Sequence, residues 1–407
     1  HFEGPDDAIA IGPALSRGAD EVISFLWGYE YKPVEYRSKL KLGLRKLKRS
    51  VTGAPPARLT VVYNGWFDHM EHVKGATAPE MDEHYASIDN LIGEAVRVFN
   101  ETMDAREKEL GQPVERYIAL ESDHGNQDIK DVLSLDKFVR RTTGARIVDK
   151  DWVKLFGMKL EGDVPEDFTD REVLVAAGEG HALLYLPKPT ADGFDWNQRP
   201  TLAELRDYPF RGEKVDIIKM GIAWRDAVSF MLGKDWDKGD VYVFGPDGEA
   251  KIEKQAGLPT RSSYRYTVTG TDPLGYAQHA RASKLVDGAF HSADDWQNAT
   301  YDSEAPDGVV MLYQAFDVPG RAPDLYLSAA PYISIGDLVD GAKSASKHGG
   351  LTKDESWSTV AFAGSGIKAQ QLKTARNVDV VPPLHHKLQK KYDADRLDGR
   401  VHPVRDE

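Results

Sequence analysis

The sequence predicts an α/β protein whose sheet is mostly parallel and is covered by helices on both faces. Short runs rich in β-branched and aromatic residues alternate with segments whose apolar residues recur at helical spacing. Strands that alternate with helices in this way typically form a parallel sheet between two helical layers. No internal repeat and no long low-complexity linker interrupts the pattern, so one large domain is expected over residues 1–407.

The first elements follow in order from local patterns. Residues 36–50 are basic with interspersed leucines, which is typical of a solvated helix face, and the Pro-containing stretch 51–57 predicts a loop. The run RLTVVYNG at 58–65 predicts a buried strand that ends at Asn-Gly. Residues 79–111 predict a long amphipathic helix, and ERYIALES at 115–122 predicts a second strand.

The later elements continue the alternation of helices and strands. Gly-Pro-Asp-Gly within 241–253 is a turn sequence between two strand-like runs and therefore predicts a hairpin. The other predicted elements are helices at 129–142 and 215–233 and strands at 181–189, 323–331 and 358–366.

Composition restricts the classes of function. Of the 407 residues, 41% are apolar and 29% charged, and the net charge of −13 disfavours a nucleic-acid scaffold, because such a surface repels phosphates. No run of 18 apolar residues is present, so no membrane span is expected. The chain has no cysteine, so any metal must be bound by histidines and carboxylates.

Potential metal ligands follow the predicted strands, where ligands bind in open α/β sheets. Asp68 and His72 come shortly after the first strand and lie four residues apart, so one helical turn would place them on the same side. A carboxylate with an imidazole suits a cation such as zinc. A chance pairing is the alternative, because the chain has 12 histidines and 65 acidic residues.

Two further candidates lie in glycine-containing loops. Asp123 and His124 precede Gly125 at the end of the 115–122 strand, where an irregular turn allows adjacent side chains to converge on one ion. A helix N-cap with a bystander histidine is the alternative for this pair. His348 precedes two glycines, and a solvated loop histidine is its alternative.

Taken together, these motifs resemble the alkaline phosphatase superfamily, in particular its type I phosphodiesterase and nucleotide pyrophosphatase branch. The matching motifs extend over roughly residues 58–390, and Ser-Asp-His-Gly is the most specific of them. In chain order they are D-x-x-x-H-x-x-G at 68–75, S-D-H-G at 122–125, H-G at 348–349 and G-x-G-I at 364–367.

The resemblance implies a fold, a reaction and a ligand set. The fold is an alkaline-phosphatase-like three-layer sandwich with an insert or cap region at about 150–285. The reaction is hydrolysis of a small-molecule phosphoric ester by in-line displacement with two divalent ions, most often zinc, and the branch favours a periplasmic or extracellular location. By this resemblance Asp68, His72 and His348 would bind one ion, and Asp123 and His124 the second.

The family also has an Asp ligand and a Thr or Ser nucleophile before the D-x-x-x-H motif, and residues 1–57 contain no matching pattern. We expect this first strand and nucleophile helix to lie outside residues 1–407, or on another chain. The alternatives are a divergent enzyme that uses activated water or another hydroxyl, and a non-catalytic subunit or pseudoenzyme that holds one metal. A sulfatase or phosphonate hydrolase on the same scaffold is a further alternative.

Two more residues are candidates for contact with substrate. Trp66 lies two residues before Asp68, and Lys347 directly precedes His348. An indole can stack on a ligand, and an ammonium can bind a phosphate oxygen. The alternative for Trp66 is a core or rim position.

Overall fold

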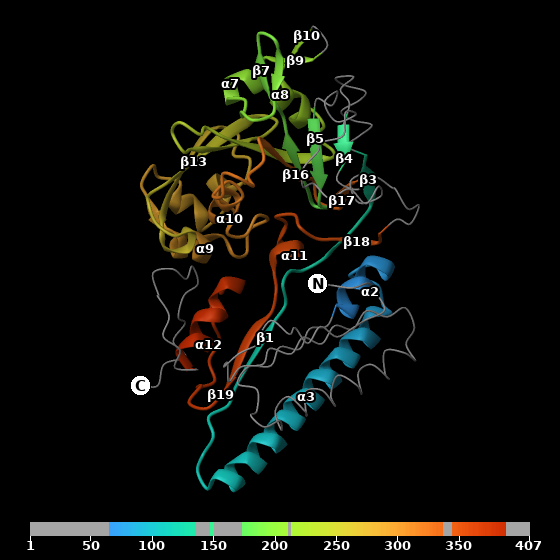
Figure 1. Cartoon of the computed structure of the whole chain (residues 1–407), viewed down its shortest axis with the longest axis vertical. Coiled ribbons are helices and arrows are strands. Elements are labelled where there is room, and N and C mark those ends of the chain that lie inside the picture. The colour runs from blue at the N-terminus through green and yellow to red at the C-terminus, as the bar shows by residue number, and fades with distance from the viewer. Residues whose placement is uncertain (1–64, 135–146, 150–172, 211–212, 337–343, 388–407) are drawn as a thin grey trace. The chain divides into compact units, whose positions relative to one another are not determined.

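A computed structural model describes residues 65–134, 147–149, 173–210, 213–336 and 344–387 (Figure 1). The chain divides into two compact units. The first comprises residues 1–118, 344–346 and 363–365, and the second comprises the rest. The predicted helix at 36–50 and the predicted loop at 51–57 lie outside the described residues, as does the predicted strand at 58–65 apart from Gly65.

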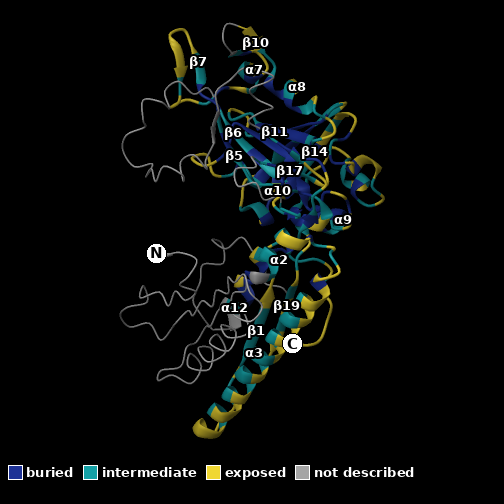
Figure 2. Ribbon diagram, turned by 90° about the vertical axis from the view of Figure 1, so that its right-hand side faces the viewer, coloured by how far each residue is buried: buried dark blue, intermediate teal, exposed yellow. Residues whose placement is uncertain are grey.

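The described part of the first unit is mainly helical. Helix α2, Trp66–Lys74, precedes helix α3, Met81–Leu110, which confirms the long helix predicted at 79–111. Gly111 ends α3 in the left-handed conformation (φ 64°), which a glycine adopts without strain. Met81 is the buried residue of α3, and most of the helix is intermediate or exposed (Figure 2).

Arg116 ties the end of α3 to the strand that follows. Its guanidinium donates to Asp104 Oδ1 and Glu107 Oε1, each at 2.8 Å. Its backbone exchanges hydrogen bonds with Ser365 at 2.9 and 3.1 Å. Strand β1, Tyr117–Glu121, pairs with β19, Val360–Gly364, so both strands predicted here are confirmed.

The second unit contains a nine-stranded sheet in the order β15-β14-β13-β12-β11-β16-β6-β5-β4. Only β4 and β5 pair in parallel, and the other neighbours are antiparallel. In chain order, the strands are β4 Ile147–Asp149, β5 Val173–Ala177, β6 His181–Tyr185, β11 Val228–Lys234, β12 Val241–Phe244, β13 Gly248–Lys254, β14 Ser263–Gly270, β15 His291–Ser292 and β16 Leu325–Ala329.

This strand arrangement does not confirm the mostly parallel sheet that the sequence predicted. Successive strands such as β12 and β13 are joined by a tight turn, with Gly245 N donating to Gly248 O at 2.8 Å. A turn this short can join only antiparallel strands, because a parallel pair needs a crossover of a dozen or more residues. The region expected to form an insert, about 150–285, supplies β5, β6 and β11–β14 to this sheet.

Helices cover both faces of the large sheet, as predicted. Along β16, Leu325 and Leu327 join one buried cluster while Tyr326 joins the other. The first cluster packs with helices α7, Leu202–Leu205, and α8, Ile217–Ile222. The second packs with α9, Ala293–Thr300, and α10, Gly308–Gln314, and the strands between are largely buried (Figure 2).

Two predicted helices are wrong in their described parts. The segment 215–233 contains only the short helix α8 and then enters β11, whose residues are almost all buried. An apolar run that is buried on both faces of a sheet lacks the alternation that identifies a strand. The segment 129–142 contains strand β3, Asp131–Leu133, which pairs in parallel with β17, Ile333–Ile335.

The remaining described elements are short. Strand β2 pairs with β18, β7 with β8, and β9 with β10. Their bounds, followed by those of the short helices, are β2 Gln127–Asp128, β18 Ser346–Lys347, β7 Lys188–Thr190, β8 Gly193–Asp195, β9 Tyr208–Phe210, β10 Glu213–Val215, α11 Lys353–Ser356, α12 Val381–Lys387, η2 Pro259–Arg261, η3 Tyr276–Gln278, η4 Ala282–Leu285 and η5 Asn377–Asp379. Among the described helices, none combines the length and the apolar character needed to cross a membrane.

Candidate metal centre

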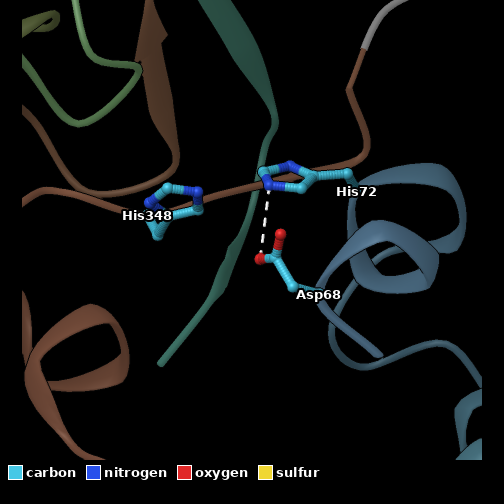
Figure 3. A group of neighbouring side chains, drawn as sticks. All are labelled: Asp68, His72 and His348. Atoms are coloured by element: carbon cyan, nitrogen blue, oxygen red, sulfur yellow. Dashed lines mark ion pairs between the residues drawn. The ribbon is translucent and has the colours of Figure 1, made fainter. Parts of the chain in front are cut away.

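Helix α2 holds the first pair of predicted ligands. Asp68 and His72 lie four residues apart, so the helix presents both side chains on one side. His72 Nε2 lies 3.4 Å from Asp68 Oδ1 (Figure 3). The carboxylate is 40% exposed and the imidazole 20%, so a solute ion can reach both.

The other ring nitrogen of His72 is held by the segment 344–346. His72 Nδ1 lies 2.9 Å from the Ser346 carbonyl oxygen and 2.9 Å from Ser344 Oγ. A carbonyl oxygen only accepts hydrogen bonds, so this contact requires a proton on Nδ1, and Nε2 is the ring nitrogen that the neutral imidazole could offer to a cation. Nε2 lies beside the Asp68 carboxylate, and a cation could take the place of the Nε2 proton between these two atoms. The donor set therefore fits a divalent ion.

His348 follows closely in the chain after the segment that contacts His72. Ser346, whose carbonyl accepts from His72, begins strand β18, and His348 follows two residues later. His348 belongs to the second unit, whereas Asp68, His72 and Ser346 belong to the first. Two imidazoles and a carboxylate are a typical ligand set for zinc.

The loop after β1 holds the second pair. His124 Nε2 lies 3.6 Å from Asp123 Oδ2. The ring of His124 stacks on that of His348, with centroids 3.9 Å apart and planes at 17°. Asp123 is 72% exposed and His124 26%, so this carboxylate is far more open to solvent than Asp68. Three predicted ligands, Asp123, His124 and His348, therefore lie together in the second unit.

Distant segments hold this loop mainly through its backbone. Ser122 N donates to Thr359 O at 2.9 Å. Asn377, in the short helix η5, donates from Nδ2 to the carbonyls of Ser122 at 3.1 Å and Asp123 at 2.7 Å. The side chain of Asp123 is thus positioned by the peptide on either side of it.

The titratable groups beside the loops respond to burial and to one another. Burial raises the pKa of the Glu121 carboxyl, and the negative charge of Asp123 raises it further. Burial lowers the pKa of Lys347, while the nearby carboxylate of Glu355 opposes that change.

Lys347 lies in a different environment from the one expected of a substrate contact. Its side chain is fully buried, and Nζ lies 3.4 Å from Glu355 Oε2. Lys347 would have to leave this ion pair in order to bind a phosphate oxygen. Trp66 begins α2, and its side chain lies outside the described residues, so its contact with substrate stays a prediction.

Sequence patterns did not identify four residues that contact the candidate ligands or their loops. Ser344 and Ser346 lie 272 and 274 residues from His72, and Asn377 lies 254 residues from Asp123. No local motif links residues that are so far apart. Glu355 is the exception, because it follows His348 by seven residues in the same short segment.

Comparison with known proteins supports the family predicted from the motifs. Residues 19–183 match the model of the type I phosphodiesterase / nucleotide pyrophosphatase family, which confirms the resemblance. The matched range includes the two Asp–His pairs, and His348 lies beyond it.

One solved structure with detectable similarity is phosphonoacetate hydrolase from Sinorhizobium meliloti 1021, crystallised in complex with phosphonoformate. The sequence identity is 13% and the TM-score is 0.34. The match covers 83% of this chain and 52% of that one, so the chain spans about half the length of that protein. The search of curated proteins gave no significant match.

Proposed function

We propose that this protein is a metal-dependent hydrolase of small-molecule phosphoric esters, of the phosphodiesterase or nucleotide pyrophosphatase type. The observation that carries the proposal is the pairing of Asp68 with His72 on one helix, where the other ring nitrogen of His72 contacts the Ser346 carbonyl. The family match over residues 19–183 supports the class of reaction.

Each residue in this proposal has a stated role. By the family motifs, Asp68, His72 and His348 would hold one ion, most often zinc in such donor sets, and Asp123 with His124 would hold a second. Two such ions supply charge stabilisation for an in-line displacement at phosphorus. The protein's own contribution is to fix the imidazoles: Ser346 O fixes the tautomer of His72, and ring stacking aligns His124 with His348.

A non-catalytic metal-binding subunit is the second candidate. Among the residues that the structure describes, it is favoured by the second set, because Asp123 and His124 are only half of the ligands that the family uses for that ion. On this alternative the chain would hold one ion and would turn over no phosphate monoester, phosphate diester or sulfate ester.

The test uses the full chain and an aryl phosphodiester, bis(4-nitrophenyl) phosphate. The proposal expects hydrolysis that stops on exhaustive chelation and returns when zinc is added, with the His84→Ala variant behaving as wild type. His84 lies on α3, away from the α2 pair in sequence, and so controls for the loss of a histidine. Hydrolysis that survives complete metal removal would contradict the proposal, and metal binding without any turnover would favour the second candidate.

A further inference from the structure

Glu355 is a buried carboxylate close in sequence to a candidate ligand. It lies in the short helix α11, seven residues after His348, and it is 2% exposed. A buried charge is costly unless hydrogen bonds and an opposite charge compensate it. The groups that compensate the charge of Glu355 therefore indicate the structural role of this carboxylate.

Donors on both sides of His348 surround this carboxylate. Oε1 accepts from Gly350 N at 3.0 Å, and Oε2 accepts from Thr352 Oγ1 at 2.7 Å. Lys347 Nζ approaches Oε2 at 3.4 Å. Lys347 and Gly350 flank His348 in the chain, so one carboxylate fixes the loop both before and after the histidine.

Neighbouring contacts leave this loop little freedom. Gly180 N donates to His348 O at 3.0 Å, and the His181 ring donates from Nδ1 to Gly349 O at 2.7 Å. The carboxylate itself packs closely against the loop, because a Cβ added to Gly350 would lie 2.6 Å from Glu355 Oε1. Three consecutive residues, 348 to 350, thus each have a fixed backbone group.

The same short helix also holds the loop with the second Asp–His pair. Glu355 O accepts from Gly125 N at 3.0 Å, and Asp354 Oδ2 accepts from Gln127 Nε2 at 3.4 Å. The approach is close enough that a Cβ on Gly125 would lie 2.6 Å from Trp357 O. One helix is thereby bonded to both ligand-bearing loops: His348 lies between the attached Lys347 and Gly350, and His124, whose ring stacks on that of His348, directly precedes the attached Gly125.

We infer that Glu355 is a positioning residue for metal binding, whose carboxylate sets the conformation of the His348 loop while its backbone anchors the Asp123–His124 loop. This inference rests on the proposed function, because it assigns a role within that site. The competing role is a buried ion pair that contributes only to stability, and such pairs can often be replaced by apolar residues with little loss.

Two double variants separate positioning from stability. Glu355→Gln with Lys347→Met removes both charges but keeps an amide oxygen that can accept from Gly350 N. Glu355→Leu with Lys347→Met removes the same charges and also that acceptor. The variants are matched for the lost ion pair, and they differ in whether the loop keeps its acceptor.

The measurements on the full chain are Co²⁺ affinity, the visible spectrum of bound Co²⁺ as a signature of its coordination, and thermal unfolding. We expect the Gln double variant to bind Co²⁺ within about threefold of wild type and the Leu double variant to bind it about 10- to 100-fold more weakly, with an altered spectrum. Equal affinity and an unchanged spectrum in both would overturn the inference.

A milder variant keeps the test decisive if the Leu double variant does not fold. Thr352→Val removes one donor to the carboxylate and leaves the ion pair in place, and we expect Co²⁺ affinity to fall by about three- to tenfold. An unchanged affinity in a folded Thr352→Val protein would then overturn the inference. Wild type that binds no Co²⁺ would overturn both the inference and the proposed function, whereas binding that none of the variants alters would overturn the inference alone.

Discussion

The two Asp–His pairs of this protein are built in different ways. Asp68 and His72 lie on successive turns of a helix, and the imidazole of His72 is itself hydrogen-bonded to residues 344–346. Asp123 and His124 are adjacent in a loop that is held by its backbone carbonyls, and the Asp123 carboxylate is 72% exposed. A ligand whose side chain is already fixed loses less entropy on binding than one that is exposed. The first pair should therefore bind its ion more tightly than the second.

The largest expected effect comes from removing a ligand of the first pair. His72→Ala deletes the nitrogen that faces Asp68, and we expect zinc affinity to fall by more than about 100-fold, beyond the range for residues that only support ligands. Competition with a chromogenic chelator measures this affinity, and His84→Ala is the matched control. Equal zinc affinity in His72→Ala and His84→Ala would show that the first pair does not bind the ion.

The next effect concerns the second pair alone. Asp123→Asn keeps the side-chain volume but weakens the ligand, so we expect the weaker zinc affinity to fall by about 10- to 100-fold while the tighter one is unchanged. Isothermal titration of metal-free protein resolves the two events. Loss of the tight event in Asp123→Asn would show that the pairs do not bind independently.

A smaller effect tests how the second loop is held. Asn377→Asp replaces the amide that donates to the Ser122 and Asp123 carbonyls with a group that cannot donate when ionised. We expect about a tenfold loss at the weaker site. The same titration measures it, and Asn298→Asp, on helix α9, is the control for the added charge. If both Asn variants lose the same affinity at the weaker zinc site, Asn377 does not position the loop.

The smallest effect tests how the first ligand is held. Ser344→Ala removes the hydroxyl beside His72 Nδ1 but leaves the Ser346 carbonyl, so the tautomer stays fixed. We expect the tighter zinc affinity to fall only about threefold, below the usual range for losing a supporting residue, because one of the two contacts survives. A chelator competition assay measures this change. A loss as large as that in His72→Ala would mean that Ser344 is needed to hold the ring.

Some of this organisation could be predicted from the sequence. The spacing of apolar residues in 79–111 predicted α3, and Gly-Pro-Asp-Gly predicted the β12–β13 hairpin, because both signals are local. The direction of the strands could not be predicted, since it depends on connections and not on strand composition. The largely buried run in β11 was mistaken for helix for a different reason, because burial on both faces hides the period of two.

The candidate site was likewise predictable only where its residues are close together in the sequence. Asp68 and His72 form a recognisable pair because helical geometry makes residues four apart neighbours. The contacts that orient the pair come from Ser344 and Ser346, more than 270 residues away, and only the folded chain brings them together. Motifs therefore identified the candidate ligands, whereas the residues that hold them required the structure.

The most direct test of the account is the zinc content of the full chain after dialysis against a weak chelator, measured by mass spectrometry for wild type and for Asp68→Ala, His72→Ala and His348→Ala. We expect wild type to retain one tightly bound ion and each of the three variants to lose it. Retention of that ion by all three variants, or its absence from wild type, would contradict the assignment of this metal centre.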